Sequence, residues 1–150
     1  MQSVDHRAAK NPKAEGMKSV EFLDHLADVQ MHCTAPCLPL LYETAVKGMM
    51  SYAVKAPTVA KGGGRVELSE GSNEMNMVAL LTHFIDLMYG EGFVAIEVSV
   101  ALKNGLLVCD YSTADGSKCQ SLCEIKAITL CDLRIFEKDG VFHSYCIFDI

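Results

Sequence analysis

The feature that most limits the possible folds is the alternation of residues 93–103, FVAIEVSVALK. Every second residue from Val94 to Leu102 is hydrophobic, which is the period of a half-buried strand. Asn104-Gly105 follows at once and is typical of a type I′ hairpin turn, after which LLVCDYS returns as a strand. A second long strand over 123–137 reaches Asp139-Gly140, and 141–150 closes the chain. The last third of the sequence therefore predicts antiparallel sheet.

Two other segments have the period of a helix. Residues 37–53 repeat hydrophobic side chains every three or four positions, and Pro39 falls in the first turn, where its missing N–H is tolerated. Residues 73–89 repeat them as well, with Ser72 as the expected N-cap and Gly90 as the expected end. The sum is an α+β domain in which two helices pack on one or two largely antiparallel sheets.

The remaining segments are shorter. Residues 1–18 are polar and predict a poorly ordered tail, so the single compact domain is expected over 19–150. Residues 19–33 predict an extended piece, a turn at DHLAD and a strand. Residues 54–64 predict a loop that ends in Gly62-Gly63-Gly64. A strand follows these glycines, so we interpret them as a flexible turn and not as a phosphate-binding loop.

The overall charge argues against one class of function. The chain has 13 Lys and Arg against 19 Asp and Glu, a net charge of −6. Strong direct nucleic-acid binding needs clustered basic residues, so we do not expect it, although work on a nucleic-acid enzyme stays open. The first eighteen residues hold no signal-peptide core, and no run is long enough to span a membrane. We therefore expect an intracellular protein, cytoplasmic or nuclear, without membrane association.

Seven cysteines have two interpretations. Two pairs share a C-x3-C spacing, Cys33 with Cys37 and Cys119 with Cys123. With His32 nearby, a zinc site is conceivable. An odd count without a secretory signal argues against a disulfide framework. Because Cys33 shares a strand face with Val29 and Met31, reduced and half-buried thiols are the favoured interpretation.

The acidic residues near the two ends of the chain are the main candidate site. Asp28 lies in the turn DHLADV directly before a strand, and Asp149 precedes Ile150, which would add a main-chain carboxylate. If the two ends meet, three carboxylates converge and would suit Ca²⁺, Mg²⁺ or Mn²⁺. The alternative is an Asx-type turn and a solvated terminus, and the sequence alone does not show that the ends meet.

Other candidates are weaker. The motifs G-x-S-x-G, Walker A and H-E-x-x-H do not occur in the sequence. The spacing of the histidines supports no pairing with a serine or cysteine, so each is interpreted as structural; they are His25, His32, His83 and His143. Lys126 lies in an otherwise apolar strand, where it either extends along the outer face of the sheet or contacts an anion.

Four segments in the same order resemble the archease family over about residues 19–150. They are EFLDHLADVQMH, LYETAVKGMMSY, EIKAIT and the closing IFDI. The resemblance implies an archease-like domain and an accessory protein that is not itself an enzyme. The implied partner is the RtcB-type tRNA-splicing RNA ligase, whose GTP-dependent, Mn²⁺-requiring guanylylation and repeated turnover archeases promote.

Residue by residue, the resemblance implies a divalent-cation site at Asp28, Asp149 and Ile150. It also implies that Lys126 contacts the partner or a nucleotide. The alternative functions are a chaperone-like modulator of a tRNA-modifying methyltransferase, a zinc- or redox-responsive protein, and, least favoured, a metal-dependent hydrolase.

The chain departs from the family pattern at four places. Leu26 replaces the usual threonine, Pro39 and Leu40 replace acidic residues, 111–113 replaces a Gly- and Glu-containing loop, and 121–123 lacks the expected glycine. These differences affect the expected loop geometry and partner affinity but none of the three predicted ligands.

Overall fold

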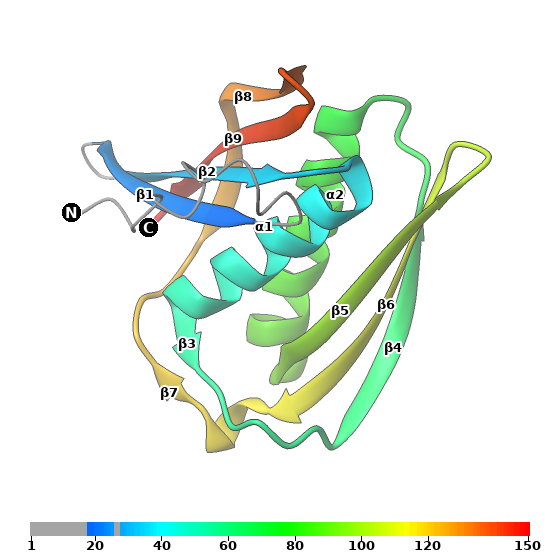
Figure 1. The fold of residues 1–150 in the computed structure, drawn as a ribbon. Coiled ribbons are helices and arrows are strands. Elements are labelled where there is room, and N and C mark those ends of the chain that lie inside the picture. The colour runs from blue at the N-terminus through cyan, green and yellow to red at the C-terminus, as the bar shows by residue number, and fades with distance from the viewer. Residues whose placement is uncertain (1–17, 26–27) are drawn as a thin grey trace.

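Two helices lie between two antiparallel sheets in the computed structural model, which describes residues 18–25 and 28–150 (Figure 1). This arrangement confirms the predicted α+β class. The helical segments are α1 (Leu38–Ala53), α2 (Asn73–Asp86), the π-helical turn η2 (Leu87–Glu91) and the short η3 (Gly116–Lys118). The strands are β1 (Ser19–His25), β2 (Asp28–Ala35), β3 (Val54–Lys55), β4 (Gly62–Leu68), β5 (Phe93–Lys103), β6 (Leu106–Asp115), β7 (Gln120–Ser121), β8 (Ala127–Lys138) and β9 (Val141–Asp149).

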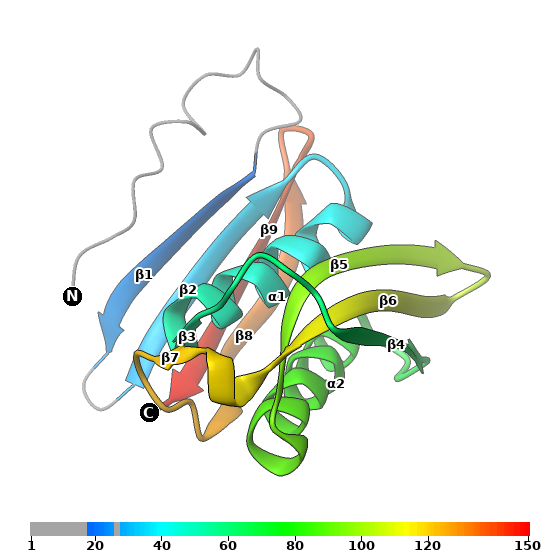
Figure 2. The ribbon, with the colours of Figure 1, turned by 90° about the horizontal axis from the view of Figure 1, so that it is seen from below.

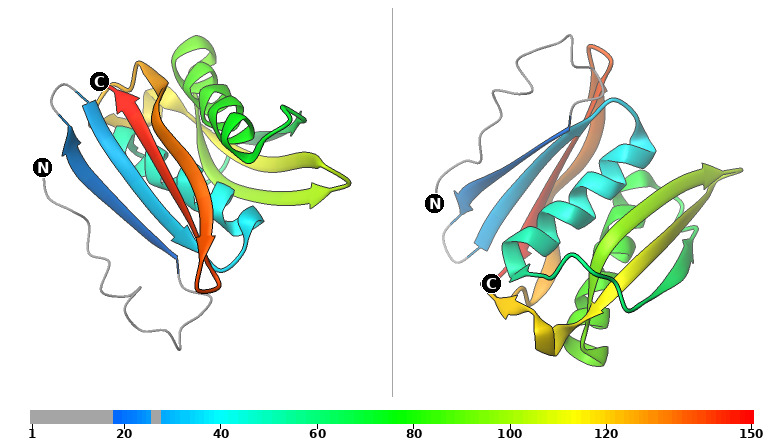
Figure 3. Two further views of the ribbon diagram at one scale, coloured as in Figure 1. Left: turned by 90° about the horizontal axis from the view of Figure 1, so that it is seen from above. Right: turned by 60° about the horizontal axis from the view of Figure 1, so that its bottom comes forward.

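The larger sheet joins both ends of the described chain. Its order is β1-β2-β9-β8, and every neighbouring pair is antiparallel. Helix α1 packs on one face of this sheet, where Met31, Cys33, Cys146 and Phe148 are fully buried. The prediction that Cys33 lies on the buried face of a strand is therefore confirmed. The opposite face of the sheet turns away from both helices (Figure 3).

Helix α1 begins and ends close to the prediction. Cys37 caps it in an extended conformation without a side-chain hydrogen bond, and Pro39 occupies the first turn. Leu41, Ala45 and Met49 are fully buried, which confirms the predicted stripe.

Helix α2 begins as predicted but ends differently. Ser72 Oγ accepts a hydrogen bond from Met75 N, which confirms the expected N-cap. The predicted end at Gly90 is wrong, because the helix widens into the π-helical turn Leu87–Glu91. That turn stops at Gly92, whose φ of 79° is in the left-handed region that favours glycine.

A three-stranded sheet has the order β4-β6-β5 and covers the other side of the helices (Figure 2), and β3 pairs with β7 in a separate two-stranded sheet. Asn104 and Gly105 have φ of 52° and 82°, as a type I′ turn requires. The alternation predicted for β5 holds only in part. The register shifts between Ala95 and Glu97, so Ile96 is half-buried, and Leu102 is exposed.

Gly62, Gly63 and Gly64 belong to strand β4, so the predicted flexible turn is wrong. They pair with β6, and a Cβ on Gly63 would lie 2.5 Å from the carbonyl oxygen of Tyr111. A Cβ on Gly64 would lie 2.6 Å from the Tyr111 hydroxyl oxygen. The glycines therefore allow β4 to approach β6 closely.

The closing hairpin also confirms its predicted turn, since Asp139 and Gly140 have φ of 53° and 78°. The predicted strand start is wrong, because β8 begins at Ala127 and not at Cys123. A bulge separates Thr129 from Arg134 in the pairing with β9.

Two strand edges are capped by helix glutamates. Glu43 Oε2 on α1 accepts a hydrogen bond from Val100 N on β5 at 2.9 Å. Glu74 Oε2 on α2 accepts one from Ile135 N on β8 at 3.2 Å. Each glutamate joins a helix to the edge of a sheet and satisfies an N–H that would otherwise be open to another strand.

Two sequence expectations fall wholly or mostly outside the described residues. They are the tail over 1–18, of which only Lys18 is described, and the departure at Leu26. Among the described helices, none is long and apolar enough to cross a membrane.

We expect Gly63→Ala to lower the free energy of unfolding by about 1–3 kcal/mol, because its Cβ would meet main-chain atoms that cannot move aside cheaply. Urea unfolding measures the change. Gly90→Ala is the control, since a Cβ there meets nothing within 4 Å. Equal stability of the two variants would contradict the close approach of β4 to β6.

Candidate functional site

The two predicted aspartates lie side by side at one end of the larger sheet. Asp28 begins β2, Asp149 ends β9, and the antiparallel register pairs them directly. Directly paired residues project from the same face, with Cβ atoms about 4.5–5.5 Å apart. Val29 and Phe148 are buried against the helices, so the two aspartates belong to the opposite face. Figure 3 shows the carboxyl end of the chain beside the start of β2.

Ile150 continues directly from this pair. Its side chain is partly buried and packs against the main hydrophobic core. The packing holds the last residue next to Asp149, so the main-chain carboxylate that the sequence predicts as a ligand would lie at the same end of the sheet. The structure thus places Asp28, Asp149 and Ile150 close together, which the sequence alone did not show.

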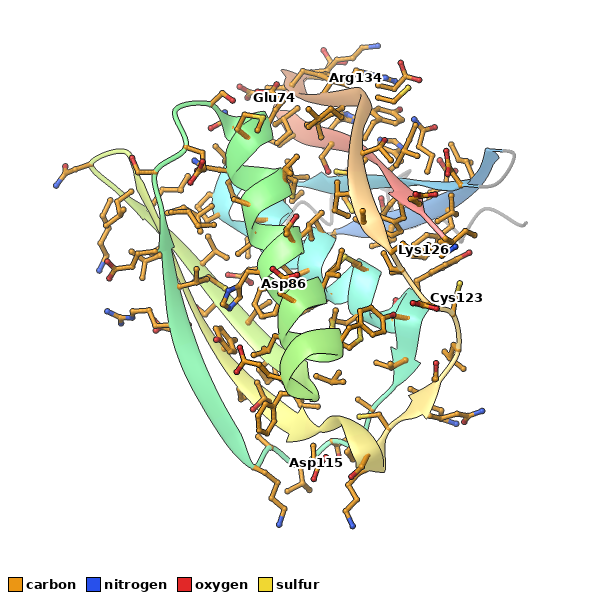
Figure 4. The ribbon with its side chains drawn as sticks, turned by 180° about the vertical axis from the view of Figure 1, so that it is seen from behind. Glu74, Asp86, Asp115, Cys123, Lys126 and Arg134 are labelled. Atoms are coloured by element: carbon orange, nitrogen blue, oxygen red, sulfur yellow. The ribbon has the colours of Figure 1, made fainter. Side chains whose placement is uncertain are left out.

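Lys126 lies at the same end of the sheet, directly before the adjoining strand β8. Its main-chain N–H donates to the carbonyl oxygen of Asp149 at 2.7 Å, and the following Ala127 pairs with Asp149 at the start of β8. The prediction placed Lys126 inside a strand, whereas it lies one residue before β8 with its side chain exposed. Figure 4 shows Lys126 at this edge of the sheet, three residues after Cys123. We call Asp28, Lys126, Asp149 and Ile150 the acidic tip.

The ligand chemistry of the acidic tip is that of a hard cation. Asp149 is exposed and Asp28 half-buried, so solvent reaches the pair. Like charges directly opposite on a sheet destabilise it unless a cation or hydrogen-bond donors compensate them. Carboxylate oxygens suit Ca²⁺, Mg²⁺ or Mn²⁺ better than softer metals. The cation itself stays a prediction.

Within residues 18–25 and 28–150, no three His, Cys, Asp or Glu side chains are placed to hold a metal ion. All seven cysteines are free thiols. Burial raises the pKa of Cys146 to about 12, and burial together with Cys146 raises the pKa of Cys33, so these two thiols stay protonated. The predicted zinc site with its cysteine pairs therefore has no counterpart in the described part of the chain.

A ladder of stacked rings follows on the same face, away from the tip. One rung crosses all four strands and consists of Glu21, His32, Tyr145 and Arg134. The His32 and Tyr145 rings stack with centroids 4.1 Å apart, and the Arg134 guanidinium lies 4.0 Å from the Tyr145 centroid. His32 Nδ1 lies 3.4 Å from a Glu21 carboxylate oxygen.

His143 lies on β9 two residues before Tyr145 and on the same face of the sheet. From the sequence spacing it was interpreted as a structural histidine without a partner. His143 Nδ1 and His32 Nε2 are 2.9 Å apart, so one ring donates to the other. The two histidines are 111 residues apart in sequence, and only the β2–β9 register brings them together. No sequence spacing could have revealed this pair.

A sequence profile of the Archease protein family matches residues 20–150, most of the chain. The chain belongs to the archease family. The zebrafish (Danio rerio) protein archease is 38% identical over 69 residues, which are 46% of this chain and 41% of that protein. The matched stretch thus spans less than half of the relative's length.

Two solved structures share the archease fold with this chain. The solution structure of protein 1598 of Methanobacterium thermoautotrophicum has a TM-score of 0.72 at 20% identity, covering 87% of this chain and 98% of that one. The crystal structure of an archease, possible chaperone, from Thermotoga maritima has a TM-score of 0.63 at 17% identity, covering 85% and 94%. At these identities the likeness shows the fold alone.

We expect acid to destabilise this archease partly through the ladder. Burial lowers the pKa of His143 below its usual value of 6.5, and the charges of His32 and Lys138 lower it further. The folded state then binds fewer protons than the unfolded state, so its stability is lost as the pH falls through about 6.5. Unfolding free energies from urea titrations at pH 7.5 and pH 5 should differ less in His143→Gln than in the wild type. An identical pH dependence would contradict this.

Proposed function

We propose that this archease is an accessory activator of the RtcB-type tRNA-splicing RNA ligase. In this proposal it promotes GTP-dependent guanylylation of the ligase, and so repeated turnover, without catalysing a reaction itself. Membership of the family supports the accessory role. The observation that carries the proposal is the β2–β9 register, which sets Asp28 beside Asp149 with Lys126 and Ile150 at the same end.

In the proposal, Asp28, Asp149 and Ile150 hold a divalent cation. When bound, such a cation would offset the charge of phosphate groups or of carboxylates near them. The chain's own contribution is rigidity: Asp28 and Asp149 sit on paired strands, and the packed side chain of Ile150 fixes the end of β9. The exposed Lys126 ammonium is free to reach an anion beyond the tip.

Charge supports the choice of partner. The chain carries a net charge of −6, and a ligase that binds RNA needs a basic surface around its active site. Opposite charges would speed the encounter and orient the acidic tip toward that surface. The tip would then favour a ligase conformation competent for guanylylation, which requires that it bind this conformation more tightly than others.

The second candidate is a chaperone-like modulator of a tRNA-modifying methyltransferase. The description of the Thermotoga maritima archease as a possible chaperone favours it. It differs from the first candidate in its partner, and it does not depend on the carboxylates of the acidic tip.

We expect Asp149→Asn to abolish most of the stimulation of ligation, because it keeps the shape of the side chain but removes its charge. The measurement is multiple-turnover RNA ligation by the cognate ligase with GTP and Mn²⁺. Asp139→Asn is the matched control: it also neutralises an exposed aspartate, in the turn between β8 and β9, and asparagine tolerates the positive φ there.

Strong stimulation by the wild type and Asp139→Asn, but not by Asp149→Asn, is the expected result. Equal stimulation by all three would contradict a role for the acidic tip. If the wild-type protein does not stimulate RNA ligation, the proposal that it activates the ligase is wrong, and a tRNA-modifying methyltransferase is the next partner to test.

We also expect Ca²⁺ or Mn²⁺ to stabilise the folded protein. A cation at a hundred times its Kd would add about 2.7 kcal/mol to the free energy of unfolding, provided that the unfolded chain does not bind it. Loss of one carboxylate in Asp28→Asn should weaken binding at least about tenfold. Thermal unfolding with and without the cation measures both effects. An equal cation-induced shift in Asp28→Asn and the wild type would argue against the predicted ligand set.

A further inference from the structure

We infer that Tyr89 is a positioning residue for the acidic tip, acting through the main chain of residues 125 and 126. This inference rests on the proposed function, because it assigns Tyr89 a role in presenting Lys126 beside Asp149. Tyr89 belongs to none of the motifs found in the sequence, and its place in the π-helical turn suggests this role.

The segment that delivers Lys126 has no regular structure of its own. Residues 122–126 lie between β7 and β8, outside any helix or strand. Leu122 N and Cys123 N both donate to the carbonyl oxygen of Ala53, at 2.8 and 3.1 Å. Contacts with other elements therefore set the path of this segment.

Two further hydrogen bonds fix its last two residues. Ile125 N donates to the Tyr89 hydroxyl oxygen at 2.9 Å, and Lys126 N donates to the carbonyl oxygen of Asp149 at 2.7 Å. Ile125 is fully buried, whereas Glu124 and Lys126 on either side are exposed. A buried N–H needs an acceptor, and Tyr89 provides the one that lies next to the tip.

The π-helical turn explains why Tyr89 can reach this N–H. In Leu87–Glu91 the helix widens, and Leu87 and Met88 stay buried while Tyr89 is 48% exposed at the surface. Single π-helical turns of this kind occur often at functional sites. Burial raises the pKa of Tyr89, the hydrogen bond from Ile125 N lowers it, and the nearby Glu124 raises it again, so the hydroxyl group stays neutral at physiological pH.

An open hollow next to the hydrogen bond makes the position of Lys126 sensitive to it. The hollow has a volume of about 470 Å³ and lies between α2 with its π-helical turn and residues 124–126. Its walls include Asp86, Tyr89 and Lys126. Figure 4 shows Asp86 on α2 and Lys126 on the segment that leads into β8. Without the Tyr89 contact, residues 124–126 could shift into this space and carry Lys126 away from Asp149.

The test uses the full-length chain in the ligase guanylylation assay. Tyr89→Phe removes the acceptor and keeps the ring, and we expect it to lower the stimulated rate about three- to tenfold, as the loss of one hydrogen bond allows. Tyr111→Phe is the matched control. It also removes a tyrosine hydroxyl, which lies 3.1 Å from His83 Nε2, but it leaves the hydrogen bond from Ile125 N to Tyr89 in place.

Two readouts separate positioning from a general loss of structure. Amide hydrogen exchange of Ile125 should accelerate in Tyr89→Phe and stay unchanged in Tyr111→Phe. If Tyr89 acts through Lys126, then Tyr89→Phe should have no added effect in a Lys126→Ala background, so the double variant should match Lys126→Ala alone.

The outcomes distinguish the two proposals. If Tyr89→Phe stimulates guanylylation as strongly as the wild type does, the positioning role is overturned and the activator proposal stands. Effects of Tyr89→Phe and Lys126→Ala that multiply would also overturn it, because Tyr89 would then act independently of Lys126. Absence of stimulation by the wild type would overturn the activator proposal, and the positioning role with it.

Discussion

The pairing of β2 with β9 is the interaction on which the rest of the structure depends. It joins residues 28–35 to 142–149 and forms the centre of the larger sheet. Its inner face supplies buried side chains that pack against α1, so sheet and helix stabilise each other. Its outer face carries Asp28 beside Asp149 at one end and the ring of His32 on that of Tyr145 further along. One register therefore sets the core, the acidic tip and the histidine pair together.

Local patterns in the sequence were enough to predict helix α1, the start of α2 and the two hairpin turns. The Asn104-Gly105 and Asp139-Gly140 dipeptides adopt the positive φ values that they favour, and α1 lies within a residue of its predicted bounds. These elements depend on contacts between residues close in sequence. The archease resemblance added the expectation that Asp28, Asp149 and Ile150 form one cation site.

Features set by contacts distant in sequence could not be predicted from the residues alone. Gly63 can pair closely with β6 because it has no side chain to meet the main chain of Tyr111, and no local pattern in the sequence indicates this contact. The π-helical turn and the bulge in β8 break the periods on which prediction relies. The meeting of Asp28 with Asp149 depends on strand register, and a shift by one residue would place the two carboxylates on opposite faces. The candidate site was therefore predicted as a set of residues but not as an arrangement.

The most direct test of the acidic tip is the paramagnetic broadening of amide signals by Mn²⁺ in a ¹⁵N-labelled sample. We predict that low Mn²⁺ concentrations broaden the signals of Asp28, Lys126, Asp149 and Ile150 first. Asp139 and Gly140, in the turn at the opposite end of β9, should keep sharp signals. Broadening that begins elsewhere, or spreads evenly over the acidic surface, would contradict a cation site at the tip.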